Sequence, residues 1–586
     1  MKKKMALFLA TLFAFSTVAT ACGEPEGPGG PGIYNKPGSK KTTIVVKNYD
    51  GGIGTEWLDE AAERFAKDQQ NASYANGKTG VYVDVQRADK IDLTTIDKDD
   101  GDIYFTERRW EIDQVQAANN VFLNITDVVK DETRNGGSIE SVIYEQKRAA
   151  VQGYDGNYYA LPHYEFFGGL TYDREAFDTI SVDNKTYAYF ANSEDTTKVQ
   201  YTSKFGSAYF VSSLEDAKKS VGPDGKKGTQ DDGLPASMEE LIILMSYFKD
   251  KTQYAPVVVS GHYPNYSNYF LSGLWASLAG VQQMTNYYNC TGEIEIVTGY
   301  KDSYLFGTNY IREPIVETVT LSEEAKNGYL GQHMAAKYYA IAMLEIMHRE
   351  GFFSSDSNKD TIDHWGAQKA LIYNPTKSSY KKVAMLMEAS YWYNEATIAG
   401  SFDDYVRLSA DKEERDVRVM MLPSSVFTQT NQMETKNTLM DIGMGVCVVN
   451  KNIENDAETL KAVKEFIRFL YSKEELAHFS SNTGMTRPLT YNLSTEQMNG
   501  LNSYSKHLYD VVGNGEATVV YYAGTTDTYK KAKSYIKICL ELPREIVIRT
   551  DSFNNYYSLL KLNNGTETLF EASKIPEDSW RTYIGG

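Results

Sequence analysis

The sequence predicts an α/β fold with at least two lobes, on three observations. Strand-like and helix-like segments alternate from Thr42 onward, which is the pattern of α/β proteins. The chain has 586 residues, which is more than one hydrophobic core normally serves. The apolar run at 383–387 (VAMLM) has the length of a strand, and it fits a strand buried on both faces of a sheet.

The first lobe is predicted to open with a strand at 42–48, a helix from about 55, a strand at 81–86 and a strand at 102–105. The helix places Trp57 and Phe65 on one face, as an amphipathic helix requires. Polar residues follow the strands: Tyr49 and Asp50 after the first, and Glu107 after the third. Glu107 is therefore a candidate ligand contact, and the alternative is a solvated loop charge paired with a neighbouring arginine.

The run at 383–387 changes character at its carboxyl end. Glu388, Ser390, Tyr391 and Trp392 follow it directly. In open α/β sheets, ligands bind at the carboxyl ends of strands. Tyrosine and tryptophan pair a broad apolar face with a polar tip, which suits a sugar ring. The alternative is a core strand that ends in packing aromatics.

Later segments continue the α/β pattern. A helix is expected at 332–348, ended by Gly351, followed after the central strand by a strand at 444–448 and a helix at 460–470. The rest of the chain is expected to be mostly helical. A strand at 256–260 should end in small and polar residues.

The amino terminus predicts export and a lipid anchor. Residues 1–21 look like a bacterial lipoprotein signal, with a basic start and an apolar run too short to span a bilayer. Cys22 would then be lipidated, by palmitate among other chains, and would hold the protein on the outer side of the cell membrane. An ordinary secretory signal with an incidental cysteine is the alternative. Residues 22–40 are rich in Gly and Pro and are expected to form a tether.

Composition excludes some partners. The formal charge of −18 argues against nucleic acid or an anionic lipid surface as the main partner. The four cysteines are widely spaced and show neither a disulfide framework nor zinc spacing. The 44 tyrosines against 24 phenylalanines fit a wide cleft for neutral hydroxylated ligands.

An acidic, glycine-rich loop at 222–235 is a candidate calcium site. Asp224, Asp231 and Asp232 supply hard oxygen ligands on a tightly bent backbone, which suits Ca²⁺. The loop is not an EF-hand, because Lys226 and Gly228 stand where side-chain oxygens would be needed. Such an ion would be structural, and a plain polar hairpin is the alternative.

Several segments, in order, resemble the extracellular solute-binding proteins (family 1 type) of carbohydrate ABC importers. Residues 57–65 (WLDEAAERF) are similar to the first helix of that family, and 158–162 (YYALP) with 170–175 (LTYDRE) to its first lobe crossing. Residues 387–395 (MEASYWYNE) are similar to its Glu-Gly-Ser-Trp-Trp ligand loop, with Ala389 and Tyr391 as departures. Residues 419–423 and 443–471 match its return to the first lobe, and 484–488 a second crossing.

This resemblance implies a two-lobed fold of the type II periplasmic-binding-protein kind, with extended hinges and an interlobe ligand cleft. The implied parts are 41–165 and 396–484 for the first lobe, and 166–395 and 485–586 for the second. The predicted ligand contacts are Tyr49, Asp50, Glu107, Tyr164, Glu165, Ser260, Tyr263, Glu388, Tyr391 and Trp392.

The expected function is capture of an oligosaccharide by cleft closure and delivery to an ABC permease, by a monomer without catalytic activity or a catalytic cofactor. One alternative is a secreted, lipid-anchored glycoside hydrolase, for which Glu107, Glu165 and Glu388 are possible carboxylates. The sequence shows no Gly-x-Ser-x-Gly elbow and no His-Glu-x-x-His helix. A second alternative is a surface glycan-docking protein that binds without closing.

Overall fold

The computed structural model describes residues 32–74, 77–107, 112–131, 137–153, 155–215, 217–263, 265–373, 382–409, 413–428, 437–441, 445–513, 517–521, 523–532, 536 and 564–585. The predicted signal (1–21), Cys22 and most of the tether lie outside these residues. Among the described helices, none combines the length and the apolarity that crossing a bilayer requires.

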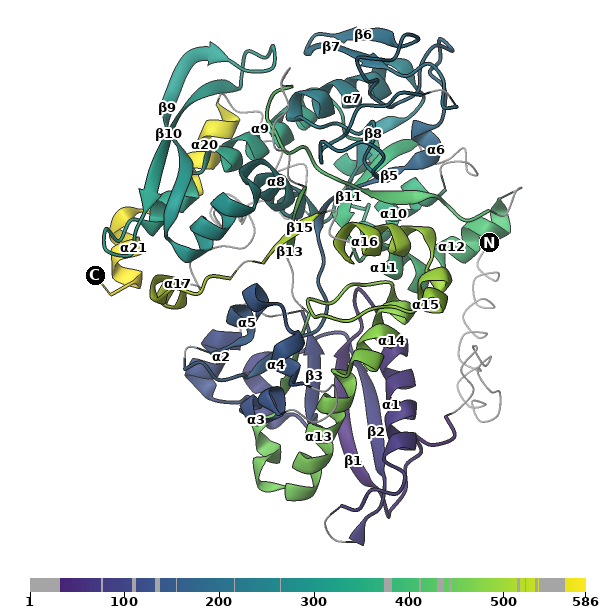
Figure 1. The fold of residues 1–586 in the computed structure, drawn as a ribbon, viewed down its shortest axis with the longest axis vertical. Helices are drawn as coiled ribbons and strands as arrows, with labels where there is room; N and C mark the ends of the chain where they lie inside the picture. Colours follow the sequence, from purple (N-terminus) through teal and green to yellow (C-terminus); the bar gives the residue numbers. More distant parts are fainter. Residues whose placement is uncertain are drawn as a thin grey trace, which may run out of the picture.

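The first lobe, at the bottom of Figure 1, is built on a five-stranded sheet of order β2-β1-β3-β14-β4. β1 is parallel to β2 and β3, and β14 is antiparallel to β3 and β4. The strands are β1 (Thr42–Tyr49), β2 (Val81–Ala88), β3 (Ile103–Thr106), β4 (Ala160–Pro162) and β14 (Val446–Val449). The helices of this lobe are α1 (Glu56–Asp68), α2 (Ile112–Asn119), α3 (Thr126–Lys130), α4 (Ile139–Val142), α5 (Glu145–Val151), α13 (Ala457–Leu470) and α14 (Lys473–Thr483).

The predicted elements of this lobe are confirmed. α1 buries Trp57 and Phe65, and β1 alternates buried with more exposed positions. α13 buries Val463 and Ile467 on one face, and Asp456 caps its first turn with side-chain bonds to two backbone N–H groups.

The second lobe, at the top of Figure 1, has a four-stranded sheet of order β12-β5-β11-β8. β11 (Val383–Ala389) is buried at all seven positions, as the apolar run predicted. It is parallel to β8 (Ala255–Val258) and antiparallel to β5 (Gly168–Asp173), so the sheet is mixed. β12 (Val417–Met420) is the edge strand beside β5.

Helices cover this sheet and extend the lobe. They are α6 (Arg174–Phe177), α7 (Met238–Lys251), α8 (Asn265–Asn289), α9 (Ala335–Arg349), α10 (His364–Ile372), α11 (Trp392–Ile398), α12 (Ser401–Leu408) and α16 (Ser503–Gly513). α9 confirms the predicted helix before Gly351, whose φ is +65°.

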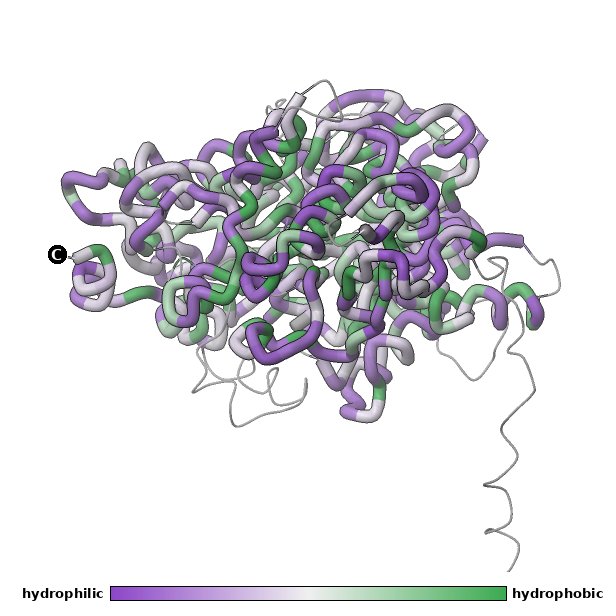
Figure 2. Tube along the Cα trace, turned by 90° about the horizontal axis from the view of Figure 1, so that it is seen from below, coloured by the Kyte–Doolittle hydropathy of each residue, from purple (hydrophilic) through white to green (hydrophobic). Residues whose placement is uncertain are grey.

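Two antiparallel hairpins in this lobe were not predicted. They are β6–β7 (Val199–Ser203 and Gly206–Phe210) and the long ribbon β9–β10 (Gly292–Tyr304 and Arg312–Leu321). The carboxyl-terminal part adds α15 (Thr495–Gly500), β15 (Thr518–Tyr521), α17 (Asp527–Ala532), α20 (Gly565–Ala572) and α21 (Glu577–Tyr583). Figure 2 shows hydrophilic segments prevailing at the outline of the molecule and hydrophobic segments mostly further in.

The region between the lobes holds a buried polar cluster. β13 (Thr438–Asp441) pairs in parallel with β15, and both lie between the lobes in Figure 1. The Lys147 ammonium forms an ion pair with Asp441, and neither side chain is exposed. Glu165 accepts a hydrogen bond from the Tyr521 hydroxyl at 3.0 Å. The cluster thus joins α5, two interlobe segments and β15.

The lobe boundaries differ from the expected ones: residues 488–490, expected in the second lobe, are hydrogen-bonded to the first-lobe segment 142–144, and a second difference concerns β12. Residues 396–484 were assigned to the first lobe, but β12 is hydrogen-bonded to β5 in the second-lobe sheet. The chain therefore returns to the first lobe after Met420, and Val446 is the first residue back in the first-lobe sheet. The cause is a strand pairing between distant segments, which local patterns do not reveal.

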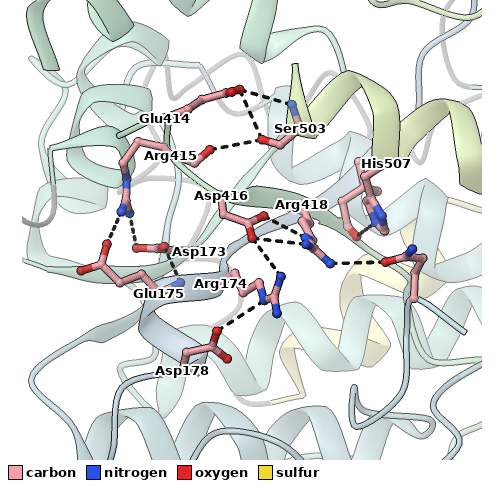
Figure 3. A network of polar contacts seen from close by, with 12 residues as sticks. Asp173, Arg174, Glu175, Asp178, Glu414, Arg415, Asp416, Arg418, Ser503 and His507 are labelled. Atoms are coloured by element: carbon pink, nitrogen blue, oxygen red, sulfur yellow. Dashed lines mark hydrogen bonds and ion pairs between the residues drawn. The ribbon is translucent and has the colours of Figure 1, made fainter. Parts of the chain in front are cut away.

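The end of the second-lobe sheet that carries Asp173 is held by a paired network of charges (Figure 3). The guanidinium of Arg415 binds Asp173 at 2.5 Å and also binds Glu175. Asp416 accepts from Arg418 at 2.8 Å and from Arg174 at 3.0 Å. These pairs tie β5 to the start of β12.

Candidate ligand-binding cleft

A cavity of about 760 Å³ is lined by residues of both lobes. The first lobe contributes Tyr49, Asp50, Gly51, Gly52 and Glu107. The second lobe contributes Tyr263, Tyr266, Tyr269, His364, Trp365, Lys369, Tyr391, Glu395, Ile398 and Ala399. The volume is within the range of small-molecule sites.

The first-lobe wall is formed where two parallel strands end. Tyr49 ends β1, Asp50 follows it, and Glu107 follows β3, so the three residues meet at one edge of the sheet. Gly52 has a φ of +74°, and a Cβ there would lie 3.1 Å from Glu107 Oε1 and 3.2 Å from the Tyr164 hydroxyl. Both the backbone and the close approach therefore require glycine at position 52.

The second-lobe wall is aromatic. Tyr263 is 39% exposed and Trp365 47% exposed, so both rings are accessible. Tyr266 and Tyr269, on successive turns of α8, contact each other edge to face at 6.0 Å. Tyr391, at the start of α11, completes the wall. Accessible aromatic rings beside hydroxyls suit the apolar faces and hydroxyl rim of a sugar.

Three glutamates gather at the cavity and titrate above their ordinary range. Glu107 accepts a hydrogen bond from Tyr164, yet burial raises its pKa to about 7. Burial and the nearby Glu107 raise the pKa of Glu395 to about 8. Glu388, buried behind the wall, has its pKa raised well above the usual value by burial and then by Glu395. The carboxyls thus compete for protons near neutral pH.

The lobes touch each other through α11. The Asn394 amide donates to the Thr483 carbonyl at the end of α14, at 2.5 Å. The Gly52 N–H donates to the Glu395 carboxylate. A Cβ on Gly54 would lie 2.8 Å from the Ile398 side chain, so the backbone there closely approaches α11. These contacts describe a closed arrangement of the cleft.

Five of the ten predicted ligand contacts line the cavity: Tyr49, Asp50, Glu107, Tyr263 and Tyr391. Their role in binding stays a prediction. Tyr164 and Glu388 lie directly behind the wall, where Tyr164 donates to Glu107 and Glu388 adjoins Glu395.

Trp392 does not line the cavity, which corrects the expectation that it stacks on a ligand. Its side chain is fully buried, its indole N–H donates to the Thr171 hydroxyl at 2.9 Å, and its ring contacts Tyr504 at 5.6 Å. Tyr391 and Trp392 start a helix, in which neighbouring side chains point about 100° apart. Tyr391 therefore reaches the cavity, and Trp392 reaches the core.

Glu165 and Ser260 are also buried away from the cavity. Glu165 belongs to the interlobe cluster with Tyr521, and burial raises its pKa to about 7. The Ser260 hydroxyl donates to the Ile362 carbonyl and accepts from the Tyr263 N–H, so it fixes the turn that carries Tyr263.

The sequence did not indicate six aromatic or ionisable lining residues: Tyr266, Tyr269, His364, Trp365, Lys369 and Glu395. Glu395 carried a usable signal, since it lies one helical turn after Tyr391 and on the same face. Trp365 and Lys369 share a similar spacing on α10. No sequence pattern in or near α10 indicated that this helix borders the cleft.

The acidic loop closes on itself. Asp231 accepts from the Asp224 N–H at 2.9 Å and from the Thr229 hydroxyl at 2.7 Å, and Asp232 accepts from the Gly228 N–H at 2.8 Å. Within the part of the chain that the structure describes, no group of three or more His, Cys, Asp or Glu side chains is placed to hold a metal ion. Calcium binding at this loop stays a prediction, which thermal unfolding with added Ca²⁺ checks.

Two α/β lobes joined by extended crossings, with a cavity lined from both sides, define the fold class of two-lobed solute-binding proteins. Among solved structures, the chain is similar to a "Chitin oligosaccharide binding protein", at 13% identity and a TM-score of 0.51, with 93% of this chain and 100% of that chain covered.

It is also similar to "SBP RafE in complex with raffinose" (11% identity, TM-score 0.48, 91% and 99% covered) and to the GacH receptor of Streptomyces glaucescens (13%, 0.47, 93% and 99%). No family model and no curated protein matches the chain. The likeness to the structure with a TM-score of 0.51 shows the fold and, at 13% identity, leaves the ligand open.

Proposed function

We propose that this protein captures an oligosaccharide in the interlobe cavity and delivers it to an ABC permease, without chemical change. The observation that carries the proposal is the two-sided wall: accessible aromatic rings on the second lobe face hydrogen-bond acceptors on the first. The solved structure with a TM-score of 0.51 is described as binding chitin oligosaccharides, which supports a sugar as the ligand class.

Capture follows from the division of roles between the walls. Trp365 and Tyr263 stack on sugar rings, and Asp50, Glu107 and Glu395 accept hydrogen bonds from hydroxyls. A ligand that contacts both lobes binds the closed state more tightly than the open state. Binding therefore shifts the population toward closure, and the closed form is the one presented to the permease.

The lipid anchor is the second part of the proposal. Lipidation of Cys22 would keep the protein beside its permease and raise the effective concentration of the partner. Replacement Cys22→Ser should move the protein from the membrane fraction into the medium or the soluble fraction. Retention of this variant in membranes contradicts the anchor.

Glycan screening followed by calorimetry tests the sugar ligand. One saturable site for an oligosaccharide supports the proposal, and no binding across a broad panel contradicts it. Incubation with labelled oligosaccharide distinguishes a binding protein from a glycoside hydrolase, because a binding protein leaves the ligand intact and a hydrolase cleaves it. Small-angle scattering distinguishes a protein that closes on its ligand from a surface glycan-docking protein, because only the closing protein becomes more compact when ligand is added.

A further inference from the structure

Among the described residues that line the cavity, acidic side chains outnumber basic ones. Asp50, Glu107 and Glu395 are acidic, and Lys369 is the one Lys or Arg side chain. In the described part of the chain, no carboxylate lies within ion-pairing distance of Lys369. Burial lowers the pKa of His364, so that ring is neutral near pH 7.

A further carboxylate sits behind this wall. Glu388 is 4% exposed, and no donor of the described residues makes a hydrogen bond with either of its oxygens. The Tyr266 hydroxyl and the Gln368 amide lie beside it without reaching hydrogen-bond geometry. Gln368 donates instead to Glu395 at 3.0 Å.

Glu107 and Glu395 come from opposite lobes, and in this arrangement the charge of Glu107 acts on Glu395. Glu107 follows β3 of the first lobe, and Glu395 belongs to α11 of the second. Closure with both groups ionised sets like charges against each other in a site partly removed from water. A positive charge supplied between the lobes relieves this repulsion. A neutral ligand supplies none, so closure around it has to take a proton from solvent.

The other groups that face this position, Lys369 excepted, favour a cation or are neutral. They are Tyr49, Asp50, Tyr164, Tyr263, Tyr266, Tyr269, His364, Lys369, Glu388 and Tyr391. Phenol rings attract an ammonium group through their faces, and their hydroxyls accept its hydrogen bonds. Lys369 alone opposes it.

We propose that the captured oligosaccharide is an amino sugar whose protonated amine binds between Glu107 and Glu395. This inference rests on the proposed function and narrows its ligand class. The ammonium donates hydrogen bonds to both carboxylates, and the carboxyl group of Glu388 lies behind Glu395. A ligand with the amine thus holds the two lobes together at the point where they otherwise repel.

Three trimers with the same β-1,4 backbone test this choice: glucosamine trimer, N-acetylglucosamine trimer and cellotriose. They differ only in an amine, an acetamide or a hydroxyl at one carbon of each ring. Calorimetry at about pH 7 should give roughly tenfold or tighter binding for the amine, because charge-assisted hydrogen bonds are the stronger ones. The same titration in two buffers of different ionisation heat should show net proton uptake with cellotriose and less with the glucosamine trimer.

Matched variants assign the preference to the carboxylate pair. Glu395→Gln and Glu107→Gln keep the shape and should each weaken binding of the glucosamine trimer by a larger factor than binding of cellotriose, so that most of the amine preference is lost. Asp403→Asn, on the exposed face of α12, removes the same charge away from the cavity and should leave the preference unchanged. Circular dichroism checks that each variant is folded.

Equal or tighter binding of a neutral trimer contradicts the amine, while leaving sugar capture intact. An amine preference that persists in both Glu→Gln variants contradicts the assigned position. Failure of all three trimers to bind contradicts this inference, and the broader glycan screen then decides whether sugar capture survives.

Discussion

The two ends of the second-lobe sheet both carry acidic side chains, but these side chains have different partners. At one end, Asp173, Glu175 and Asp416 each meet an arginine (Figure 3). Arg418 and Arg174 hold the pKa of Asp416 below its ordinary value despite burial. At the cleft end, Glu388 and Glu395 meet no cation among the described residues, and their pKa values are raised.

This difference separates holding a fold from holding a ligand. A buried carboxylate that is paired with arginine contributes to a fixed structure, whereas an unpaired one keeps its capacity for an external donor. Sequence patterns alone do not separate structural carboxylates from ligand-binding ones, but the presence or absence of a cationic partner in the structure does. Four predictions test the contrast.

Removal of the arginine at the paired end should have the largest effect. Arg415→Met leaves Asp173 buried without its partner, and the free energy of unfolding should fall by about 3–5 kcal/mol. Urea unfolding measures it. Arg407→Met, whose guanidinium is largely exposed and pairs with Asp404, is the control and should cost less than about 1 kcal/mol. Equal losses in both variants would show that the buried network does not hold the sheet.

The unpaired end should make stability depend on pH. The pKa of Glu395 in the folded state, about 8, is above its value in the unfolded state. The stabilising contribution of Glu395 to the free energy of unfolding is therefore present at low pH and is lost as the pH rises from about 4.5 to 8. Glu395→Gln removes this dependence. Relative to wild type, the variant should gain about 1–2 kcal/mol between pH 5 and 8.5, a range set by the partial burial of the site. A difference that stays constant across this range contradicts the raised pKa.

The aromatic wall at the cleft should matter for binding and not for folding. Trp365→Ala removes an accessible ring, and sugar affinity should fall by about 1–2 kcal/mol, which calorimetry measures. Tyr304→Ala, an exposed aromatic on β9, serves as the control and should bind normally. Trp392→Ala should instead unfold the protein more readily, because that ring belongs to the core. Unchanged affinity in Trp365→Ala would remove that ring from the site.

The contact between α11 and α14 should have the smallest effect. Asn394→Ala removes the hydrogen bond to the Thr483 carbonyl, which is worth about 0.5–1.5 kcal/mol. Scattering without ligand should show a more open average shape, and ligand affinity should fall several-fold, with the unfolding midpoint nearly unchanged. If the average shape stays as compact as in the wild type, this bond does not hold the lobes closed.

Local patterns were enough to predict the elements that carry the sheets. The apolar run of β11 and the spacing of Trp57 and Phe65 on α1 each report burial within a few residues, so both were predicted correctly. The β9–β10 ribbon was missed, because most of its residues are exposed and the pairing of its two strands leaves little apolar periodicity.

The site was predictable where it lies at strand ends and less so elsewhere. Tyr49, Asp50 and Glu107 follow strands that the sequence predicted, and all three line the cavity. The place of Trp392 depends on the angle between consecutive side chains at a helix start. The contribution of α10 depends on tertiary packing, which no short motif encodes.

The pairing of β13 with β15 has a consequence for how this chain can be assembled. Asp441 lies in an interlobe segment, yet the strand beside it, Thr518–Tyr521, comes from much later in the chain. A ribosome or a secretion channel that releases the chain from its amino terminus delivers that strand after every strand of the two lobe sheets. The junction between the lobes is therefore completed only after both sheets have been delivered, and a chain truncated before Thr518 should keep its first-lobe sheet while losing the fixed orientation of one lobe to the other.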